Sequence, residues 1–344
     1  MDTGSGVLVL GGSCFMGRSL VAKLGPILQV HCVNRGNTYW NEASHPSVRA
    51  DRENAKKFRE SIVRFLSENP GIQWRGIIDF SAYTPRDVID ALPDALFDGS
   101  QFPWYVFIST DSVYEVVSDI GTHRTDPVRE SITDSCITNQ RLDKYGFEKL
   151  ETEKAIMNRS RGNQNVINLR LPDVLGEFDD TYRLWKYKGL IESGRPIFVS
   201  PEMRSVPVSF VYSQDVVDSI LNILFRGLLT PQIVFESVNI ACREQVSMLN
   251  FLDLLGKVIG RRVEYTTKKK QRQHAFLPSV ERRVASLSLE KAERLLGFSP
   301  TPLEEVLRRT VAWLTEAEHR FPKQAKKALK HVERSSSSGD SSSD

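Results

Sequence analysis

The chain has 344 residues, of which 40% are hydrophobic and 26% are charged, and its 46 Lys plus Arg against 43 Asp plus Glu leave a formal net charge of +3. This balance excludes a wholly disordered chain and a collagen-like repeat, and four Cys in so long a chain exclude a small disulfide scaffold. The length predicts about two domains, and a net charge so near zero does not by itself indicate a nucleic-acid-binding protein.

The amino-terminal segment is typical of neither a signal peptide nor a membrane span. Its apolar run covers only Val7 to Leu10, and no basic residue precedes it. The Cys residues lie far apart without a CxxC pair, so we expect reduced thiols and no metal site. These features predict a cytoplasmic protein without membrane contact, and the basic clusters of the sequence are also compatible with the nucleus.

Short apolar runs bounded by turn residues alternate with amphipathic stretches through the first half of the chain. Strands are expected at 7–10, 28–33, 77–80, 104–109 and 166–169, with a short extended run at 48–50 and a helix at 55–66. This alternation predicts an α/β fold with a Rossmann-type doubly wound parallel sheet. The second half is more mixed, with helices expected at 182–192, 213–225, 247–259, 288–296 and 303–318, and an extended piece at 263–267.

A glycine-rich turn follows the first expected strand and leads into a helix. Its residues are Gly11, Gly12, Ser13, Cys14, Phe15, Met16 and Gly17. In a dinucleotide-binding fold the first glycine makes the tight turn, the middle one admits the pyrophosphate, and the last lets helix and strand pack closely. Cys14 stands at the middle position, where its Cβ crowds the phosphate. The placement of this turn after the first strand of the alternating pattern still favours a nucleotide site over a turn that binds nothing.

The end of the second expected strand indicates which dinucleotide would bind. Asn34 and Arg35 stand about twenty residues beyond the turn, where an acidic residue would bind the ribose hydroxyls of NAD. Arg35 could instead pair with a 2′-phosphate, so NADP is slightly favoured over NAD, with a solvated loop arginine as the alternative. Asp51 could accept a hydrogen bond from the adenine amino group, or it could cap the helix that follows.

Tyr145 and Lys149 lie four residues apart and would share one face of a helix. An ammonium beside a phenol favours the phenolate, which lowers the pKa of the phenol toward the range of a general base. The strand before them delivers Thr110 and Asp111 at its carboxyl end, where open α/β sheets place their ligands. These residues together predict a catalytic site.

With these motifs the chain resembles an extended short-chain dehydrogenase/reductase of the NAD-dependent epimerase/dehydratase family. The matching segments follow the family's order from residue 7 to about 318: VLVLGGSCFMG, FISTDSVYE, YGFEK, NLRLPDVLG, VSFVYSQDVVDSIL and LSLEKAERLLGFSPTPLEEVLRRTVAWL. The substituted middle glycine, the Asn-Arg-Gly after the second strand and the DDTYRLWKYK stretch look most like an atypical subgroup. That subgroup includes the chloroplast stem-loop-binding proteins, which are known for RNA binding.

The resemblance implies an oxidoreductase or epimerase that acts on a nucleotide sugar or related polyol by hydride transfer. It makes Tyr145 the acid/base, and it makes Lys149 both its pKa-lowering partner and a ligand of the nicotinamide ribose. Thr110 would orient the substrate oxygen, and Ser81 and Ala82 would flank the nicotinamide ribose.

Other residues receive weaker assignments from the same resemblance. Asp111 is either catalytic or a turn carboxylate, and Ser112 stands where a sugar 4,6-dehydratase carries Glu, which disfavours that reaction. Arg183 and Arg204 in the variable lobe are candidate substrate contacts. Family members often form homodimers through two helices, one of which carries the residue that corresponds to Tyr145.

The domain boundaries follow from these assignments. We expect an NAD(P)-binding Rossmann domain over 1–175, to which the chain returns around 206–240. A smaller mixed α/β substrate lobe would comprise 176–205 and 241–320. A basic helix is expected at 321–334, and the Ser- and Asp-rich residues 335–344 are expected to be disordered because they lack any apolar anchor.

Two carboxyl-terminal stretches concentrate positive charge. Residues 257–283 hold nine basic and two acidic residues, and residues 320–334 hold six basic residues and one acidic residue, for local charges of +7 and +5. Because a diphosphate needs only one or two arginines, RNA is an alternative partner for these stretches. An RNA-binding protein on a dehydrogenase scaffold, with little or no catalysis, is therefore the alternative function. A solvated lysine-rich helix face is the simpler interpretation of the second stretch.

Overall fold

The computed structural model describes residues 4–37, 40, 47–117, 127–135, 137–160, 164–201, 204, 207–226, 235–267 and 286–333. Its centre is a parallel sheet of seven strands in the order β11-β6-β5-β4-β1-β2-β3. The chain order reverses between β1 and β4, and doubly wound sheets bind their ligands at such a reversal. The strands are β1 Ser5–Leu10, β2 Gln29–Asn34, β3 Ser47–Arg49, β4 Gln73–Asp79, β5 Trp104–Thr110, β6 Asn165–Leu171 and β11 Phe235–Asn239.

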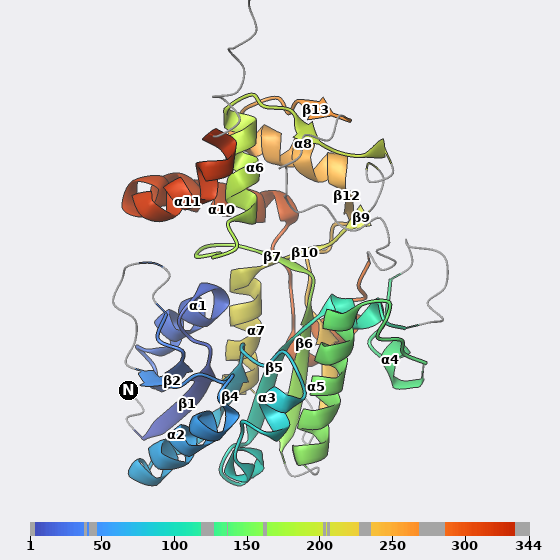
Figure 1. Ribbon diagram of the computed structural model, residues 1–344. Helices are drawn as coiled ribbons and strands as arrows, with labels where there is room; N and C mark the ends of the chain where they lie inside the picture. Colours follow the sequence, from blue (N-terminus) through green and yellow to red (C-terminus); the bar gives the residue numbers. More distant parts are fainter. Residues whose placement is uncertain are drawn as a thin grey trace, which may run out of the picture.

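Helices cover both faces of the sheet (Figure 1). One face packs against α1 Phe15–Leu24, α7 Ser213–Arg226 and α9 Glu290–Leu296. The other packs against α2 Ala55–Glu68, α3 Arg86–Ile89, the 3-10 helix η1 Asp94–Phe97 and α5 Lys144–Ser160. In β1, Val7 and Val9 point to the first face while Leu8 and Leu10 point to the second, and all four are 0% exposed. Strands buried on both sides need apolar residues at successive positions, so the apolar runs of the sequence predicted them.

The predicted Rossmann-type fold is confirmed, and its element boundaries shift by a few residues. The strand expected at 77–80 begins at Gln73, and the helix expected at 55–66 continues to Glu68. Two short helical segments flank the carboxyl end of β5 and the approach to α5, namely η2 Asp111–Tyr114 and α4 Ile132–Ser135. In the described residues, no helix is long and apolar enough to cross a membrane.

A second lobe lies beyond the carboxyl ends of the sheet strands (Figure 1). Lys188, which is 1% exposed, joins two of its helices by donating to Glu318 Oε1 at 2.8 Å. The division of the chain into separate domains stays a prediction. The helices of the lobe are α6 Arg183–Glu192, α8 Met248–Ile259, α10 Leu303–Arg320 and α11 Pro322–Glu333. Its short strands pair as β8 Ile197–Phe198 with β13 Tyr265–Thr266, β9 Pro207–Val208 with β12 Val246–Ser247, and β7 Asp173–Leu175 with β10 Phe210–Tyr212.

Trp40 connects the two parts of the molecule. It belongs to the segment between β2 and β3, yet its side chain is 1% exposed within the aromatic core of the second lobe. Its ring centroid lies 5.3 Å from that of Trp313 and 5.2 Å from that of Phe321. Trp40 is thereby packed against Trp313 of α10 and Phe321 at its end.

Candidate functional site

A cavity of about 910 Å³ opens at the carboxyl ends of the central strands, where the strand order reverses. It contains most of the residues that the sequence singled out, although these lie on seven separate segments of the chain. Gly12, Ala82 and Arg204 are the predicted site residues that do not line it. Those that do are Gly11, Ser13, Phe15, Met16, Gly17, Asn34, Arg35, Asp51, Ser81, Thr110, Asp111, Tyr145, Lys149 and Arg183.

The backbone of the glycine-rich turn is packed closely against the start of α1. Gly11 has a φ of +94°, which favours glycine, and a Cβ on Gly17 would lie 2.2 Å from the carbonyl oxygen of Gly11. Helix α1 can therefore start directly beneath the turn. Cys14 precedes the helix, and its side chain makes no capping bond to the first backbone N–H groups. These N–H groups therefore have no side-chain cap from Cys14, and the residues that carry them, Phe15, Met16 and Gly17, line the cavity.

Cys14 has a half-buried thiol at the expected phosphate position. Burial raises its pKa to about 12, and the nearby charge of Asp180 adds to this effect. The side chain is therefore an uncharged thiol at neutral pH, and it narrows the pocket without adding a negative charge. We conclude that the substituted middle glycine changes the shape of the turn more than its electrostatics.

Two adjacent carboxylates line the same end of the cavity, and the sequence motifs gave them no role. Burial raises the pKa of Asp179, although two hydrogen bonds from Thr181 oppose this effect. Burial also raises the pKa of Asp180. Both carboxyl groups act electrostatically on Cys14, so an anion bound at the glycine-rich turn would feel their charge. The sequence DDTYR shows the two adjacent Asp residues, but only the fold shows that they lie near the glycine-rich turn.

The cavity also reaches the carboxyl ends of β2 and β3. The Arg35 side chain is 53% exposed there, and its Nη1 lies 3.8 Å from Glu53 Oε1. Asp51 accepts the backbone N–H of Glu53 at 3.1 Å, so it shapes the turn before α2, whose N-cap is Asn54. Asp51 thus lines the cavity, whereas the alternative interpretation, that it caps the following helix, is wrong because Asn54 is the cap.

Thr110 and Tyr145 meet at the carboxyl end of β5. Thr110 Oγ1 accepts the backbone N–H of Ser112 at 3.2 Å, which fixes its hydroxyl at the end of the strand. The Tyr145 hydroxyl shares a hydrogen bond with Thr110 that favours the phenolate, but burial dominates and raises the pKa of Tyr145, with Tyr83 and Asp111 adding to the increase. The lowered pKa expected from the Tyr-Lys spacing is thus contradicted by the structure.

Lys149 explains this difference. Its Nζ donates to the carbonyl oxygens of Ala82 at 2.8 Å and Ile108 at 2.9 Å, and the residue is 3% exposed. The ammonium group is thereby held at the carboxyl ends of β4 and β5 by backbone carbonyl groups. Burial lowers the pKa of Lys149 to about 8, so it is mainly charged at neutral pH. Ala82, which does not line the cavity, contributes by holding this lysine through its carbonyl.

The remaining predicted residues lie at different depths. Asp111 is 5% exposed and lines the cavity beside Thr110. Arg183 lies at the rim, where its Nη1 donates to Asp173 Oδ1 at 2.8 Å. Arg204 is exposed and lies outside the cavity, so the structure does not bring it to the other candidates.

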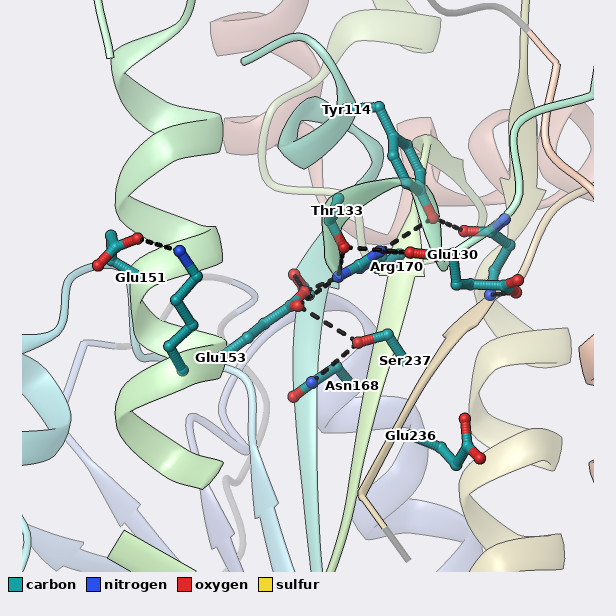
Figure 2. A network of polar contacts seen from close by, with 12 residues as sticks. Tyr114, Glu130, Thr133, Glu151, Glu153, Asn168, Arg170, Glu236 and Ser237 are labelled. Atoms are coloured by element: carbon teal, nitrogen blue, oxygen red, sulfur yellow. Dashed lines mark hydrogen bonds and ion pairs between the residues drawn. The ribbon is translucent and has the colours of Figure 1, made fainter. Parts of the chain in front are cut away.

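Behind the cavity, a buried polar network holds helix α5 against the sheet (Figure 2). Glu153, one turn beyond Lys149, accepts from Arg170 Nε at 3.0 Å and from Nη2 at 2.6 Å, and Ser109 donates to it at 2.5 Å. Arg170 also donates to the hydroxyl of Thr133 at 3.0 Å. The network joins α5 to β5, β6 and α4, and thus orients the helix that carries Tyr145 and Lys149.

The basic stretches are described only in part. Residues 268–285 and 334–344 lie outside the described residues, so most of the first stretch and the Ser-rich tail stay predictions. On α11 the exposed residues include Lys323, Lys326, Lys327 and Lys330, whereas Ala325 and Ala328 are buried. This helix therefore presents a basic outer face.

Comparisons with known proteins agree with the fold. No family model matches the chain, and no curated protein matches its sequence. Among solved structures, it is similar to a UDP-glucose 4-epimerase with UDP-glucose from Thermotoga maritima, at 19% identity and a TM-score of 0.66 over 91% of this chain and 99% of that one. It is also similar to a dTDP-glucose 4,6-dehydratase with NAD from Bacillus anthracis, at 16% identity and a TM-score of 0.68 over 93% and 99%.

A third similar structure is a UDP-glucuronic acid 4-epimerase from Bacillus cereus in complex with NAD. It has 17% identity and a TM-score of 0.65 over 90% of this chain and 99% of that one. At such identities the likeness shows the shared fold, which covers both lobes, because nearly the whole length of each protein is aligned.

Proposed function

We propose that the protein is a nicotinamide-dinucleotide-dependent oxidoreductase or epimerase whose substrate is a nucleotide sugar or a related polyol. The observation that carries the proposal is the meeting of Thr110, Tyr145 and Lys149 with the glycine-rich turn in one cavity. The phenol of Tyr145, hydrogen-bonded to the Thr110 hydroxyl and close to the buried ammonium of Lys149, is suited to proton transfer. The similarity of the fold to NAD-bound epimerase and dehydratase structures supports the choice of cofactor class.

The residues of the cavity fit a dinucleotide. The uncapped start of α1 and the close approach of Gly17 to Gly11 leave backbone donors for the pyrophosphate. Arg35 and Asp51 would hold the adenosine half, and Ser81 and Lys149 would hold the nicotinamide ribose. When bound, the nicotinamide ring would accept hydride from the substrate carbon or return it.

Tyr145 would move the proton between its phenol and the substrate oxygen, while Thr110 orients that oxygen by a hydrogen bond. Because the pKa of Tyr145 is raised, the phenol is protonated at neutral pH. In this state it is suited to donate a proton to a carbonyl oxygen, which is the reductive direction. In the oxidative direction the phenol must first lose its proton, and the hydrogen bond with Thr110 favours that loss.

We further propose that NADP is preferred to NAD. Arg35 follows β2 at the place where a 2′-phosphate would lie, and its nearest described acidic partner, Glu53, is 3.8 Å away and largely exposed. An arginine paired so loosely can turn to a phosphate, because guanidinium groups bind phosphate oxygens with charge-assisted bonds.

The experiment is a fluorescence titration of the purified protein with NADPH and with NADH, followed by a Tyr145→Phe variant. We expect both cofactors to bind, with NADPH the tighter ligand, and the variant to bind them as the unmodified protein does. The same variant should lose turnover by about 10²- to 10⁴-fold on any sugar or polyol substrate found by screening. Absence of binding by either cofactor would remove the basis of the proposal.

RNA binding is the second candidate function, and the exposed lysines of α11 favour it. Lys323, Lys326, Lys327 and Lys330 lie on its outer face, and no tight cluster of this kind is needed for a dinucleotide. RNA affinity should fall steeply with salt and should weaken when these four residues are changed to Gln. Binding that is absent or independent of salt would exclude this function.

A further inference from the structure

Asp79 is a buried carboxylate that none of the proposed roles uses. It ends β4, between β1 and β5, and is 0% exposed. Arg52 holds both of its oxygens, with Nη1 2.8 Å from Oδ1 and Nη2 2.8 Å from Oδ2. Tyr105 donates its hydroxyl to Oδ2, also at 2.8 Å. Removing such a pair from water is costly, so stability alone is a poor explanation for its presence.

The carboxylate of Asp79 also shapes the turn after β4. Its Oδ1 accepts the backbone N–H of Ser81 at 2.9 Å and that of Ala82 at 3.0 Å. The carbonyl of the same Ala82 accepts the ammonium of Lys149 at 2.8 Å. One residue of the turn is therefore held by Asp79 through its N–H and holds Lys149 through its C=O.

Arg52 extends this arrangement toward the other end of the cavity. It follows Asp51 and lines the cavity where the adenosine half of a dinucleotide is expected. Its Nη1 also donates to Ser81 Oγ at 2.8 Å, and its Nε donates to the carbonyl of Asp87 at 3.0 Å. The guanidinium thus binds the turns after β3 and β4 together.

We propose that the Asp79–Arg52 ion pair is a positioning device for Lys149, which fixes the turn that holds the lysine and supplies the charges that balance its ammonium. The inference rests on the proposed function, because Lys149 matters only if it serves a bound cofactor and Tyr145. Asp79 and Arg52 are positioning residues here, since they act on Lys149 through the backbone of the turn and through the electrostatic effect of their charges.

The charges around Lys149 come from several elements and have different signs. Asp79 on β4, Glu153 on α5 and Asp87 on α3 favour the charged ammonium, whereas Arg52 disfavours it, as does burial. The rings of Tyr83 and Phe107 face the ammonium at 4.8 Å and 4.7 Å. Neutralising Asp79 and neutralising Arg52 should therefore shift the titration of Lys149 in opposite directions.

The test is an NMR titration of the side-chain nitrogens in ¹⁵N-lysine-labelled, cofactor-free protein. The signal of Lys149 is assigned by its loss in a Lys149→Met variant. Relative to the unmodified protein, Asp79→Asn should lower the titration midpoint by about one pH unit or more, and Arg52→Gln should raise it. Combining both changes should return the midpoint toward its original value, because the net charge near the ammonium is then restored.

Shifts in the same direction for both variants, or no shift in either, would overturn the proposal. If Asp79→Asn does not fold, the comparison of Arg52→Gln with Arg52→Lys decides, since Lys keeps the charge and should keep the original midpoint. Equal midpoints in Arg52→Gln and Arg52→Lys would then overturn it. Because this readout needs no cofactor, it is independent of the NADPH titration, so failure of the positioning role and failure of the proposed function are told apart.

Discussion

The buried ion pair between Glu153 and Arg170 should contribute strongly to the orientation of α5, and the variant Glu153→Gln measures how strongly. Both side chains are almost fully buried, with 3% and 2% of their surface exposed. The change keeps the size of the side chain but leaves the Arg170 guanidinium without its charge partner. Breaking a buried pair in this way costs about 3 to 5 kcal/mol, so the free energy of unfolding should fall by that amount.

The control lies two residues away on the same helix (Figure 2). Glu151 pairs with Lys154 at 2.7 Å, but these side chains are 35% and 44% exposed. Glu151→Gln should therefore lower the free energy of unfolding by less than about 1 kcal/mol. The assay is urea unfolding at neutral pH, monitored by tryptophan fluorescence. The dependence of the free energy of unfolding on urea concentration is compared among the variants. Equal losses in the two variants would refute the assignment of Glu153 as the anchor of α5.

Three further predictions concern ligand binding in the cavity. Gly17→Ala should weaken NADPH binding by about tenfold or more, because the added Cβ would lie 2.2 Å from the carbonyl oxygen of Gly11. The control is Gly71→Ala, whose added Cβ would meet no atom within 4 Å and which should bind NADPH as the unmodified protein does. Equal affinities of the two variants for NADPH would contradict this prediction. Asp180→Asn should tighten NADPH binding by about threefold to tenfold, because it removes the repulsion between this carboxylate and the pyrophosphate. In the unmodified protein the affinity should rise on acidification, at a higher pH than an ordinary Asp would require, because burial raises the pKa of Asp180. A titration across pH in which the variant binds NADPH equally or more weakly would argue against this. Arg35→Ala should weaken NADPH by about tenfold and leave NADH nearly unchanged, so an equal loss for both cofactors would contradict the assignment of Arg35 to a 2′-phosphate.

The sequence predicted the sheet well because its strands are local apolar runs that need no knowledge of their partners. The runs at 7–10 and 104–109 are buried on both faces, so every residue in them must suit a core, and the pattern is visible without the fold. The Tyr145–Lys149 spacing was equally local. Their placement in one cavity with Thr110 followed from the rule that parallel strands present their carboxyl ends at one edge.

The sequence could not predict contacts that depend on long-range partners. Asp79 meets Arg52 across 27 residues, and Trp40 packs against residues near position 313 in another lobe. A charged residue at the end of an apolar strand was the only signal for Asp79. The direction of the pKa shift of Tyr145 was also beyond reach, since it depends on the burial of the phenol and on the carbonyls that hold Lys149.

Titration of the unmodified protein with NADPH and NADH measures whether this cavity binds a nicotinamide dinucleotide. The structure predicts saturable binding of NADPH well below millimolar concentration, weaker binding of NADH, and loss of affinity in Gly17→Ala but not in Gly71→Ala. Failure of both cofactors to bind below millimolar concentration by a protein that is folded would contradict the account.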